Sequence, residues 1–532
     1  MKLLKYICLS AFAMTAAGCS DFLEEYSQDK YYVSSWKDLN ELLLGDCYMP
    51  ADNTQRTVWS STTCAKIHYL ADEIQDFNKS EGGNQDMDGH DPVFGYYTWQ
   101  QRTGQNETYS DFHPENQDWT KLYKLINVAN NIIESAEDIP QNDDEERQGY
   151  LKVTGEARFL RAYYYFYLAN LYGKPYHPDS AKVDLAVPIK TSSEVEDKKF
   201  QRNTVQEVYD LVLSDLLIAE QNLSRYTSPQ PSIYRADSVA AQLLLSRVYL
   251  YMQNWSKAEE YADKVIKAHP ALRNLNTDMS TFAVASNEEN IFSMGGDDLP
   301  CAFVNATQSF AVDNELYYAY DSEDLRRTLW YWHKGTFTGL TKVAPRVGGW
   351  FGQEREPSSS DYYLYMFYNS HEGLQPEVSS MFLMRSAEAY LNKAEALAYQ
   401  GKYDEARNTV NTLRWYRFRT RADEKRVLKS TGTELIDDIR NERRLELALE
   451  GHRWFDLRRY LVCSVHPDSK EIVHYYTYYR DRYESEITAY RKFTLQKWDP
   501  AYTLNIPHEV IEFNTGMTQN YRPWRTYEDV EF

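Results

Sequence analysis

The chain has 532 residues, enough for several domains by length alone, and its 42% hydrophobic and 26% charged content is ordinary for a globular protein. The formal net charge of −21 argues against binding nucleic acid or anionic lipid, because either partner would need a basic face. Aromatic residues make up 15% of the chain, with 45 Tyr and 12 Trp, an excess that needs an explanation.

Residues 1–18 have the pattern of a targeting segment and not of folded structure. A short basic region precedes an apolar run over residues 3–17, and small residues lie directly before Cys19. This pattern resembles a lipobox, in which Cys19 is acylated and becomes the first residue of the mature chain. An ordinary secretory signal with a chance cysteine is the alternative. Acyl chains would hold the protein on a membrane, and no other stretch is long and apolar enough to span one.

Neither the cysteines nor the acidic loops give a complete metal site. Beyond Cys19 the mature chain has four cysteines without CxxC or histidine-paired spacing, namely Cys47, Cys64, Cys301 and Cys463. A Cys47–Cys64 disulfide and free buried thiols both remain open. Residues 84–89 match the first half of an EF-hand loop, but Gly95 stands where a bidentate Glu is required, so a solvated acidic loop is favoured over a calcium site.

Helical patterns dominate the N-terminal half. The expected elements are an early helix over 36–44, a helix over 118–138, a charged connector over 141–148 and an amphipathic helix over 203–223. Thr204 and Glu207 form a capping box for the last of these. Residues 155–173, GEARFLRAYYYFYLANLYG, are apolar on most faces and stop at Gly173 and Pro175, which predicts the buried central helix of an all-helical core.

Residues 237–270 read as a tetratricopeptide unit, because 34 residues is the length of that repeat. Ala258 is the small residue where its two helices cross, and Ser256 and Glu259 are expected to cap the second helix.

Residues 385–416 repeat the pattern, with Gly401 at the turn and Ala406 at the crossing. With helix pairs built from 118–138 and 155–223, these units predict a mostly α scaffold of about four stacked helix pairs, since such pairs bury a shared seam. We place this scaffold at about 118–270 and 378–460.

Two regions fall outside the helical periodicity. Residues 271–377 are rich in glycine and aromatic residues, which indicates an ordered, partly β insertion laid over the scaffold. Residues 78–116 are polar and irregular. We expect both to form the loop-rich, ligand-binding region, and residues 472–495 alternate enough to form a short hairpin.

Three stretches carry a family resemblance that covers most of the chain. Residues 155–173 closely resemble the signature helix of the SusD/RagB family, the surface glycan-binding lipoproteins of Gram-negative nutrient-uptake systems. Residues 439–459, IRNERRLELALEGHRWFDLRR, and 505–520, NIPHEVIEFNTGMTQN, resemble the C-terminal helix-and-turn and the closing segment of that family. The acidic residues 20–25 look like a surface-export signal of such lipoproteins.

The resemblance implies a non-enzymatic receptor, without cofactor, that captures starch or another oligosaccharide or polysaccharide on the outer membrane. Family members cover a SusC-like TonB-dependent transporter as its lid. One SusD-like domain would then span residues 19–532. A peptide-uptake receptor of the RagB type is the alternative, and a glycoside hydrolase is a weaker one, because paired carboxylates can be distant in sequence.

No catalytic signature supports an enzyme: GxSxG, HExxH and GxxxxGK are absent from the sequence. The charged cluster over 442–456 is interpreted as structural ion pairs, because Arg443 and Glu446 lie one turn apart on one helix face. His452 is interpreted as a packing residue.

Flat aromatic side chains outside the helices are the candidate ligand-binding residues, because the C–H faces of sugar rings stack on them. They are Tyr96, Tyr97, Trp99, Trp330, Trp332 and Trp350. The resemblance implies an aromatic arc built from an early loop and the insertion, but no motif fixes its positions. The alternative is that these rings pack the insertion onto the scaffold. We expect at least one of the four tryptophans to be a stacking platform.

Overall fold

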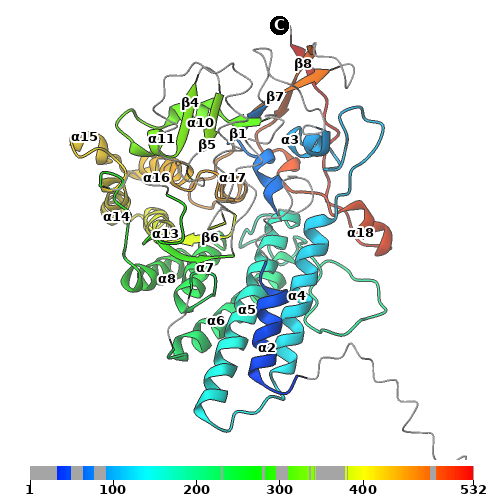
Figure 1. Ribbon diagram of the computed structural model, residues 1–532. Coiled ribbons are helices and arrows are strands. Elements are labelled where there is room, and N and C mark those ends of the chain that lie inside the picture. The colour runs from blue at the N-terminus through cyan, green and yellow to red at the C-terminus, as the bar shows by residue number, and fades with distance from the viewer. Residues whose placement is uncertain are drawn as a thin grey trace, which may run out of the picture.

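The computed structural model describes residues 33–49, 64–76, 91–228, 232–277, 282–294, 310–334, 337–340, 342, 378–379, 381–479 and 487–530. These residues form the expected mostly helical fold, a tetratricopeptide-like scaffold with a few short sheets (Figure 1). Among the helices of these ranges, none is long and apolar enough to cross a bilayer.

The N-terminal helices form a bundle around the predicted central helix. α2 (Trp36–Leu42), α4 (Gln117–Ser135) and α6 (Val205–Arg225) pack on α5 (Asp144–Tyr172), and Figure 1 shows α2, α4 and α5 side by side. From Phe159 to Tyr172 every residue of α5 is buried, which confirms a central buried helix that ends before Gly173. The capping box of Thr204 and Glu207 is also confirmed.

The expected connector over 141–148 is wrong in its second half, because α5 begins at Asp144. The side chain of Asp143 caps the helix by accepting a hydrogen bond from the backbone N–H of Glu146 at 2.8 Å. The acidic residues of the first turn stabilise the helix because they lie at the positive end of its dipole. One turn further on, α2 crosses so closely that a Cβ added to Gly149 would lie 2.1 Å from the Trp36 ring.

Both predicted repeat units are helix pairs. They are α7 (Ser238–Tyr251) with α8 (Trp255–Ala268), and α13 (Ser386–Tyr399) with α14 (Tyr403–Trp415). The crossing residues Ala258 and Ala406 are fully buried, and Gly401 adopts a φ of +77° at the turn of the second pair.

The predicted cap of α8 is wrong. α8 begins at Trp255, so the capping side chain is that of Asn254, which accepts a hydrogen bond from the N–H of Lys257 at 3.2 Å. Glu259 instead binds Lys402 at 2.9 Å, which joins the first repeat unit to the second.

The helices stack in chain order, with α5 on α6, α6 on α7, α7 on α8, and α8 on α13. α13 also packs against α16 (Gly432–Glu446), which α17 (Arg453–Leu461) follows. The shorter helical elements are α3 (Phe94–Tyr97), α10 (Asn314–Ala319), α11 (Leu325–Leu329), α15 (Asp423–Arg426), α18 (His508–Phe513), the π-helical turn η1 (Leu43–Cys47) and the 3-10 turns η2 (Ala65–Leu70), η3 (Asp91–Val93) and η4 (Pro500–Tyr502).

Short antiparallel sheets tie the insertion to the rest of the chain. β1 (Ile74–Asp76) pairs with β3 (Phe310–Val312), and β2 (Asn290–Ser293) pairs with β6 (Leu383–Arg385), which leads directly into α13. Within the insertion, β4 (Tyr331–Lys334) pairs with β5 (Phe337–Leu340). The insertion is therefore partly β and anchored, as expected.

The predicted C-terminal hairpin is confirmed. β7 (Ile472–Tyr479) pairs with β8 (Ile487–Leu495), and β9 (Glu528–Val530) adds a third strand to the sheet. Cys47, Cys64 and Cys463 are buried free thiols, so the disulfide alternative for Cys47 and Cys64 is wrong.

Candidate ligand-binding surface

The aromatic residues predicted in the early loop pack inward. The ring of His474 on β7 is stacked between Tyr97, at 4.1 Å between centroids, and Trp99, at 4.3 Å. Trp99 is fully buried with a φ of +52°, and its indole N–H donates to the carbonyl oxygen of Leu70 at 3.0 Å. Burial lowers the pKa of His474 to about 4, so the sandwiched ring is neutral. Tyr96 is 5% exposed. These rings attach the loop to the hairpin and offer no free face to a ligand.

Trp330 is also fully buried. Its ring packs on Phe282 at 4.7 Å between centroids, with the Lys342 ammonium 4.1 Å from the ring centroid. The packing alternative therefore describes Tyr97, Trp99 and Trp330. Trp332 lies on β4, and the structure does not describe its side chain; Cys19 and Trp350 lie outside the described residues.

The exposed aromatic surface of the insertion is built from α10, α11 and β4. Tyr318 is 58% exposed, and Tyr317 stacks on His333 at 4.4 Å between centroids and 15° between planes. The hydroxyl of Tyr318 lies 3.1 Å from Nε2 of His333, whose Nδ1 lies 2.8 Å from the hydroxyl of Thr338. The guanidinium carbon of Arg327 lies 4.8 Å from the Tyr317 centroid and 5.4 Å from the Tyr318 centroid. We call Tyr317, Tyr318, Arg327 and His333 the insertion surface.

The insertion surface combines an open aromatic ring with polar groups held around it. Burial and the neighbouring Arg327 lower the pKa of His333, so the imidazole is neutral near pH 7 and uses its two nitrogens to hold the hydroxyls of Tyr318 and Thr338. This is the chemistry that a sugar requires, an apolar ring for its C–H face and polar groups for its hydroxyls. Sequence reasoning selected four tryptophans together with Tyr96 and Tyr97, and it missed these residues. The signal was the run Tyr317-Tyr318-Ala319-Tyr320 within the insertion.

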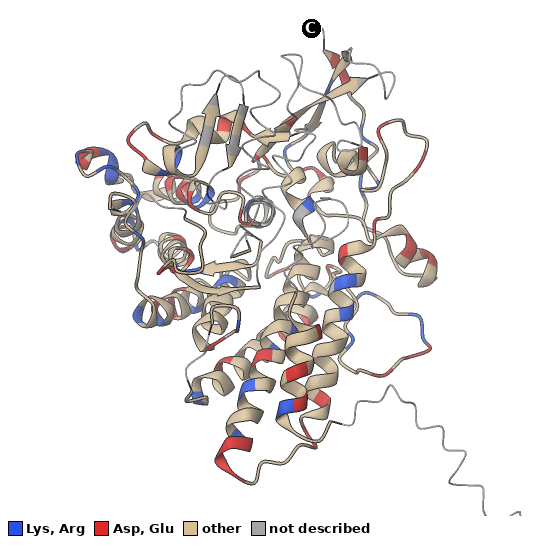
Figure 2. Ribbon diagram, in the orientation of Figure 1, with Lys and Arg blue, Asp and Glu red and all other residues tan. Residues whose placement is uncertain are grey.

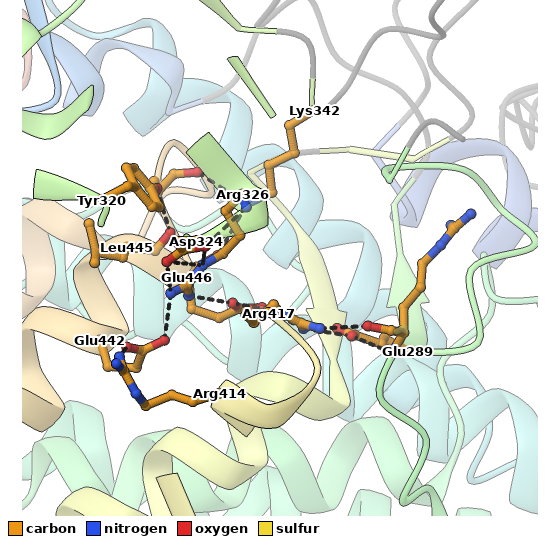
Figure 3. A network of polar contacts seen from close by, with 12 residues as sticks. Glu289, Tyr320, Asp324, Arg326, Lys342, Arg414, Arg417, Glu442, Leu445 and Glu446 are labelled. Atoms are coloured by element: carbon orange, nitrogen blue, oxygen red, sulfur yellow. Dashed lines mark hydrogen bonds and ion pairs between the residues drawn. The ribbon is translucent and has the colours of Figure 1, made fainter. Parts of the chain in front are cut away.

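A buried ionic network joins the insertion to α16 (Figure 3). Arg326 forms an ion pair with Glu442 at 2.7 Å and donates to Glu446 at 2.8 Å. Arg417 donates to Glu446 at 2.8 Å and to Glu289 at 2.6 Å. All five side chains are 1% exposed or less. Removing any one charge would leave others buried and unpaired, so the network is a structural anchor.

Two more cations extend this network. Arg385, at the start of α13, donates to Glu289 and to Glu450, both at 3.0 Å. Lys342 of the insertion has its ammonium against Glu450. Burial lowers the pKa of Lys342 to about 8, although Glu450 opposes that shift. The described part of the insertion therefore carries its own ion pair to the segment between α16 and α17.

The ion-pair interpretation of the charged cluster is confirmed, but the pairing is different. Burial alone would raise the pKa of Glu446, yet Arg417 and Arg385 hold it well below its usual range. Arg443 pairs with Asp456 of α17 at 2.9 Å and not with Glu446. His452 is buried, and burial together with nearby arginines holds its pKa well below its usual range, as expected of a neutral packing residue.

The charged side chains form no further candidate binding site in the ranges that the structure covers. Figure 2 shows Lys and Arg interspersed with Asp and Glu along most of the ribbon in this view. Within the described residues, no group of three or more His, Cys, Asp or Glu side chains could hold a metal ion. The acidic stretch 84–89 lies outside these residues.

Two family models match the chain over most of its length. The model described as "SusD family" matches residues 323–524, and the model described as "Starch-binding associating with outer membrane" matches residues 21–250. The chain belongs to the SusD family.

The relatives bear out this membership at the level of sequence and fold. SusD-like protein P38 of Formosa agariphila is 25% identical over 521 residues, which are 86% of this chain and 92% of that protein. The crystal structure of a SusD superfamily protein from Bacteroides thetaiotaomicron superposes with a TM-score of 0.64 at 22% identity, over 92% of this chain and 100% of that one. A SusD-like carbohydrate binding protein from Bacteroides vulgatus gives a TM-score of 0.64 at 19% identity, over 91% and 98%.

Proposed function

We propose that this SusD-family protein binds a glycan at the cell surface and does not cleave it. The observation that carries the proposal is the match of the N-terminal part of the chain to a family model described as starch-binding. A structural relative named as a carbohydrate binding protein supports it. Arg417 and Arg385 hold the pKa of Glu446 well below its usual range, which supports a receptor over a hydrolase that uses this carboxylate, because a general acid must be able to hold and release a proton.

The insertion surface is the proposed place of ligand binding. Tyr318 is exposed, whereas Trp99 and Trp330 are buried, so we place the stacking platform at Tyr318, Trp332 or Trp350. A sugar ring on Tyr318 would lie beside Arg327, whose N–H groups would donate to its hydroxyls, while His333 holds the Tyr318 hydroxyl in place.

The cellular role that we propose follows the family. Cys19 would carry the lipid anchor, residues 19–532 would form one SusD-like domain, and the protein would deliver its ligand to a SusC-like TonB-dependent transporter in the outer membrane. The description of the family model as associating with the outer membrane supports this location.

The experiment is a glycan-array screen run beside a peptide-binding assay, followed by calorimetric titration with the glycan that binds. Tyr318→Ala, Trp332→Ala and Trp350→Ala are compared with wild type. At least one should lose about tenfold or more in affinity, equal to ~1.4 kcal/mol, with an unchanged melting temperature. The control is Trp415→Ala, because Trp415 is 43% exposed on α14, outside the insertion.

The alternatives give different results. Binding of peptides and of no glycan would indicate a peptide-uptake receptor of the RagB type. Release of reducing ends from the bound polysaccharide would indicate a glycoside hydrolase. If the protein binds a glycan and all three variants bind as wild type does, the insertion surface is not the binding site.

A further inference from the structure

The segment that closes the chain carries an unusual share of the exposed aromatic side chains. Of the ten aromatic side chains that are exposed among the described residues, five lie within residues 498–527. They are Trp498, Phe513, Tyr521, Trp524 and Tyr527. This segment begins after β8, contains η4 and α18 and leads into β9, and Figure 1 draws it in orange-red to red. Single exposed rings are common on protein surfaces, so the candidate for binding is the ring that the structure holds in place beside polar donors.

Trp524 is exposed but firmly positioned. On one side of it, Arg522 is buried and donates from Nε to the carbonyl oxygen of Gln100 at 3.1 Å. On the other side, Arg525 is buried and pairs with Asp499 at 2.8 Å. Trp524 lies between these two anchors with 59% of its surface exposed. Its backbone is fixed at both neighbours, so its indole face is presented at little cost in conformational entropy on binding.

The ring next to Trp524 connects it to the core. Tyr109 lies 5.6 Å from Trp524 between centroids, and it also packs edge-on against the buried Phe94 at 5.6 Å. The amide of Gln100 donates to the Tyr109 hydroxyl at 3.2 Å. Burial raises the pKa of Tyr109 to about 12, so this hydroxyl keeps its proton and can itself donate.

The polar partner at this surface is Arg491 of β8. Its guanidinium is held between two tyrosine rings, 3.7 Å from the centroid of Tyr478 and 4.2 Å from that of Tyr527. Among the described residues, its buried Nε has no hydrogen-bond acceptor and no carboxylate forms an ion pair with it. Tyr527, which contacts this guanidinium, lies three residues after Trp524 and packs on Phe493 at 5.7 Å between centroids. Phe493 and Tyr109 both pack on Phe94, which joins the two sides of this surface. A guanidinium held between two rings has its terminal N–H groups fixed in one plane, which suits it to bind oxygen atoms of a ligand.

The charge around Arg491 favours a neutral ligand over an acidic one. Asp529 lies directly opposite Arg491 in the pairing of β8 with β9, and its side chain is exposed. Lys492 and Glu528, the next pair, form their own ion pair at 3.1 Å. The local charges therefore nearly cancel, and the chain as a whole carries −21. A uronic acid or a sulfated sugar would gain little attraction here.

We propose that Trp524 and Arg491 form a second sugar-binding subsite, which takes one neutral pyranose unit of the glycan. The indole of Trp524 stacks on the C–H face of the sugar, and Arg491 and the Tyr109 hydroxyl donate to its ring substituents. This proposal rests on the proposed glycan-binding function, but it involves different elements from the insertion surface. A second subsite would lengthen the stretch of polysaccharide that one molecule holds.

A protein partner fits this surface less well. Protein interfaces have a continuous apolar core with a polar rim. The large apolar side chains exposed in residues 498–530 are all aromatic, with no exposed Leu, Ile, Val or Met in the described part of that segment. Single Trp and Tyr rings separated by charged residues suit separate sugar units better.

The test is native affinity electrophoresis in gels that contain amylopectin, xyloglucan or galactomannan. Wild type is compared with Trp524→Ala, Arg491→Lys and the control Trp415→Ala, whose ring is stacked with Arg426 at 3.9 Å and is also exposed. In the gel that retards wild type, Trp524→Ala should bind about tenfold more weakly, and the control should be unchanged. Arg491→Lys keeps the charge and loses the planar donors, so it should also weaken binding. Thermal melts check that each variant is folded.

Each outcome bears on a different claim. If wild type is retarded and Trp524→Ala is retarded equally, the second subsite is excluded and the glycan-binding function stands. If no gel or array glycan binds wild type, the proposed function and the subsite fall together. If Trp524→Ala keeps full retardation but loses co-purification with an outer-membrane transporter, the surface binds a protein and the sugar proposal is overturned.

Discussion

Replacing Glu446 by Gln tests whether the buried ionic network holds the insertion on the scaffold. Four N–H donors converge on this carboxylate. Oε1 accepts from Arg385 at 2.5 Å and from Arg417 at 2.8 Å, and Oε2 accepts from Arg326 at 2.8 Å and from Arg417 at 2.9 Å. Gln has nearly the same shape, but an NH₂ group replaces one of the two carboxylate oxygens and then faces two N–H donors. One negative charge is also lost. Breaking a buried pair in this way costs about 3–5 kcal/mol.

The assay is urea unfolding of the chain without residues 1–18, followed by tryptophan fluorescence. Because domains are typically stable by about 5–15 kcal/mol, the variant should unfold at a clearly lower urea concentration. The control is Glu260→Gln on α8, whose ion pair with Lys257 at 2.7 Å is about half exposed, and its effect should stay within ~0.5 kcal/mol. A loss below ~1 kcal/mol for Glu446→Gln would refute the anchoring role.

Three further predictions concern the packing of the scaffold, the loss of folding stability at acidic pH and the lipid anchor. Leu at Ala258 or at Ala406 should overpack a fully buried helix crossing and cost ~1–3 kcal/mol; thermal melts equal to wild type at both sites would contradict the assigned crossings. Burial opposes ionisation of Glu395, yet Arg459 lowers its pKa from 4.5 to about 2, so its contribution is complete above pH 4.5 and declines toward pH 2. In Glu395→Gln the free energy of unfolding should fall less steeply between pH 4.5 and pH 2 than in wild type. An equal slope in the two proteins would exclude Glu395 as a source of this acid sensitivity. Cys19→Ser should leave the protein soluble or unprocessed, and undiminished membrane retention in fractionation, with the transporter absent, would rule out the anchor.

The helical scaffold could be predicted because its signals are local. The apolar run over 155–173 and the repeat units over 237–270 and 385–416 depend on residues within one or two turns of each other, and each became a helix or a helix pair. The errors were also local. The acidic residues 143–146 are typical both of a solvated connector and of a helix N-terminus, and only the cap formed by Asp143 decides between the two.

The site could not be predicted because its contacts are distant in sequence. Trp99 is buried by His474, 375 positions later, and nothing in the pattern around Trp99 indicates that partner. The same limit explains the pairing error in the charged cluster. Sequence spacing pointed to Arg443 and Glu446, whereas Glu446 binds Arg326, Arg385 and Arg417 from three other segments.

Tyrosine explains much of the aromatic excess. Several buried tyrosines donate their hydroxyl to a backbone carbonyl oxygen of a loop or helix end far away in sequence: Tyr164 to Cys47, Tyr165 to Lys190, Tyr167 to Met381, Tyr320 to Leu445 and Tyr502 to Lys470. A long irregular segment has many carbonyls without a backbone partner, and burying one unpaired is costly. A tyrosine buries a large apolar ring and still supplies the missing donor, which phenylalanine cannot. An aromatic-rich composition is therefore expected of a helical scaffold that must hold long loops, whether or not it binds a ligand. The exposed fraction of each side chain distinguishes the rings that hold the loops from the rings that can contact a sugar, which the amino-acid composition does not do. By this criterion the candidates are Tyr318 and Trp524.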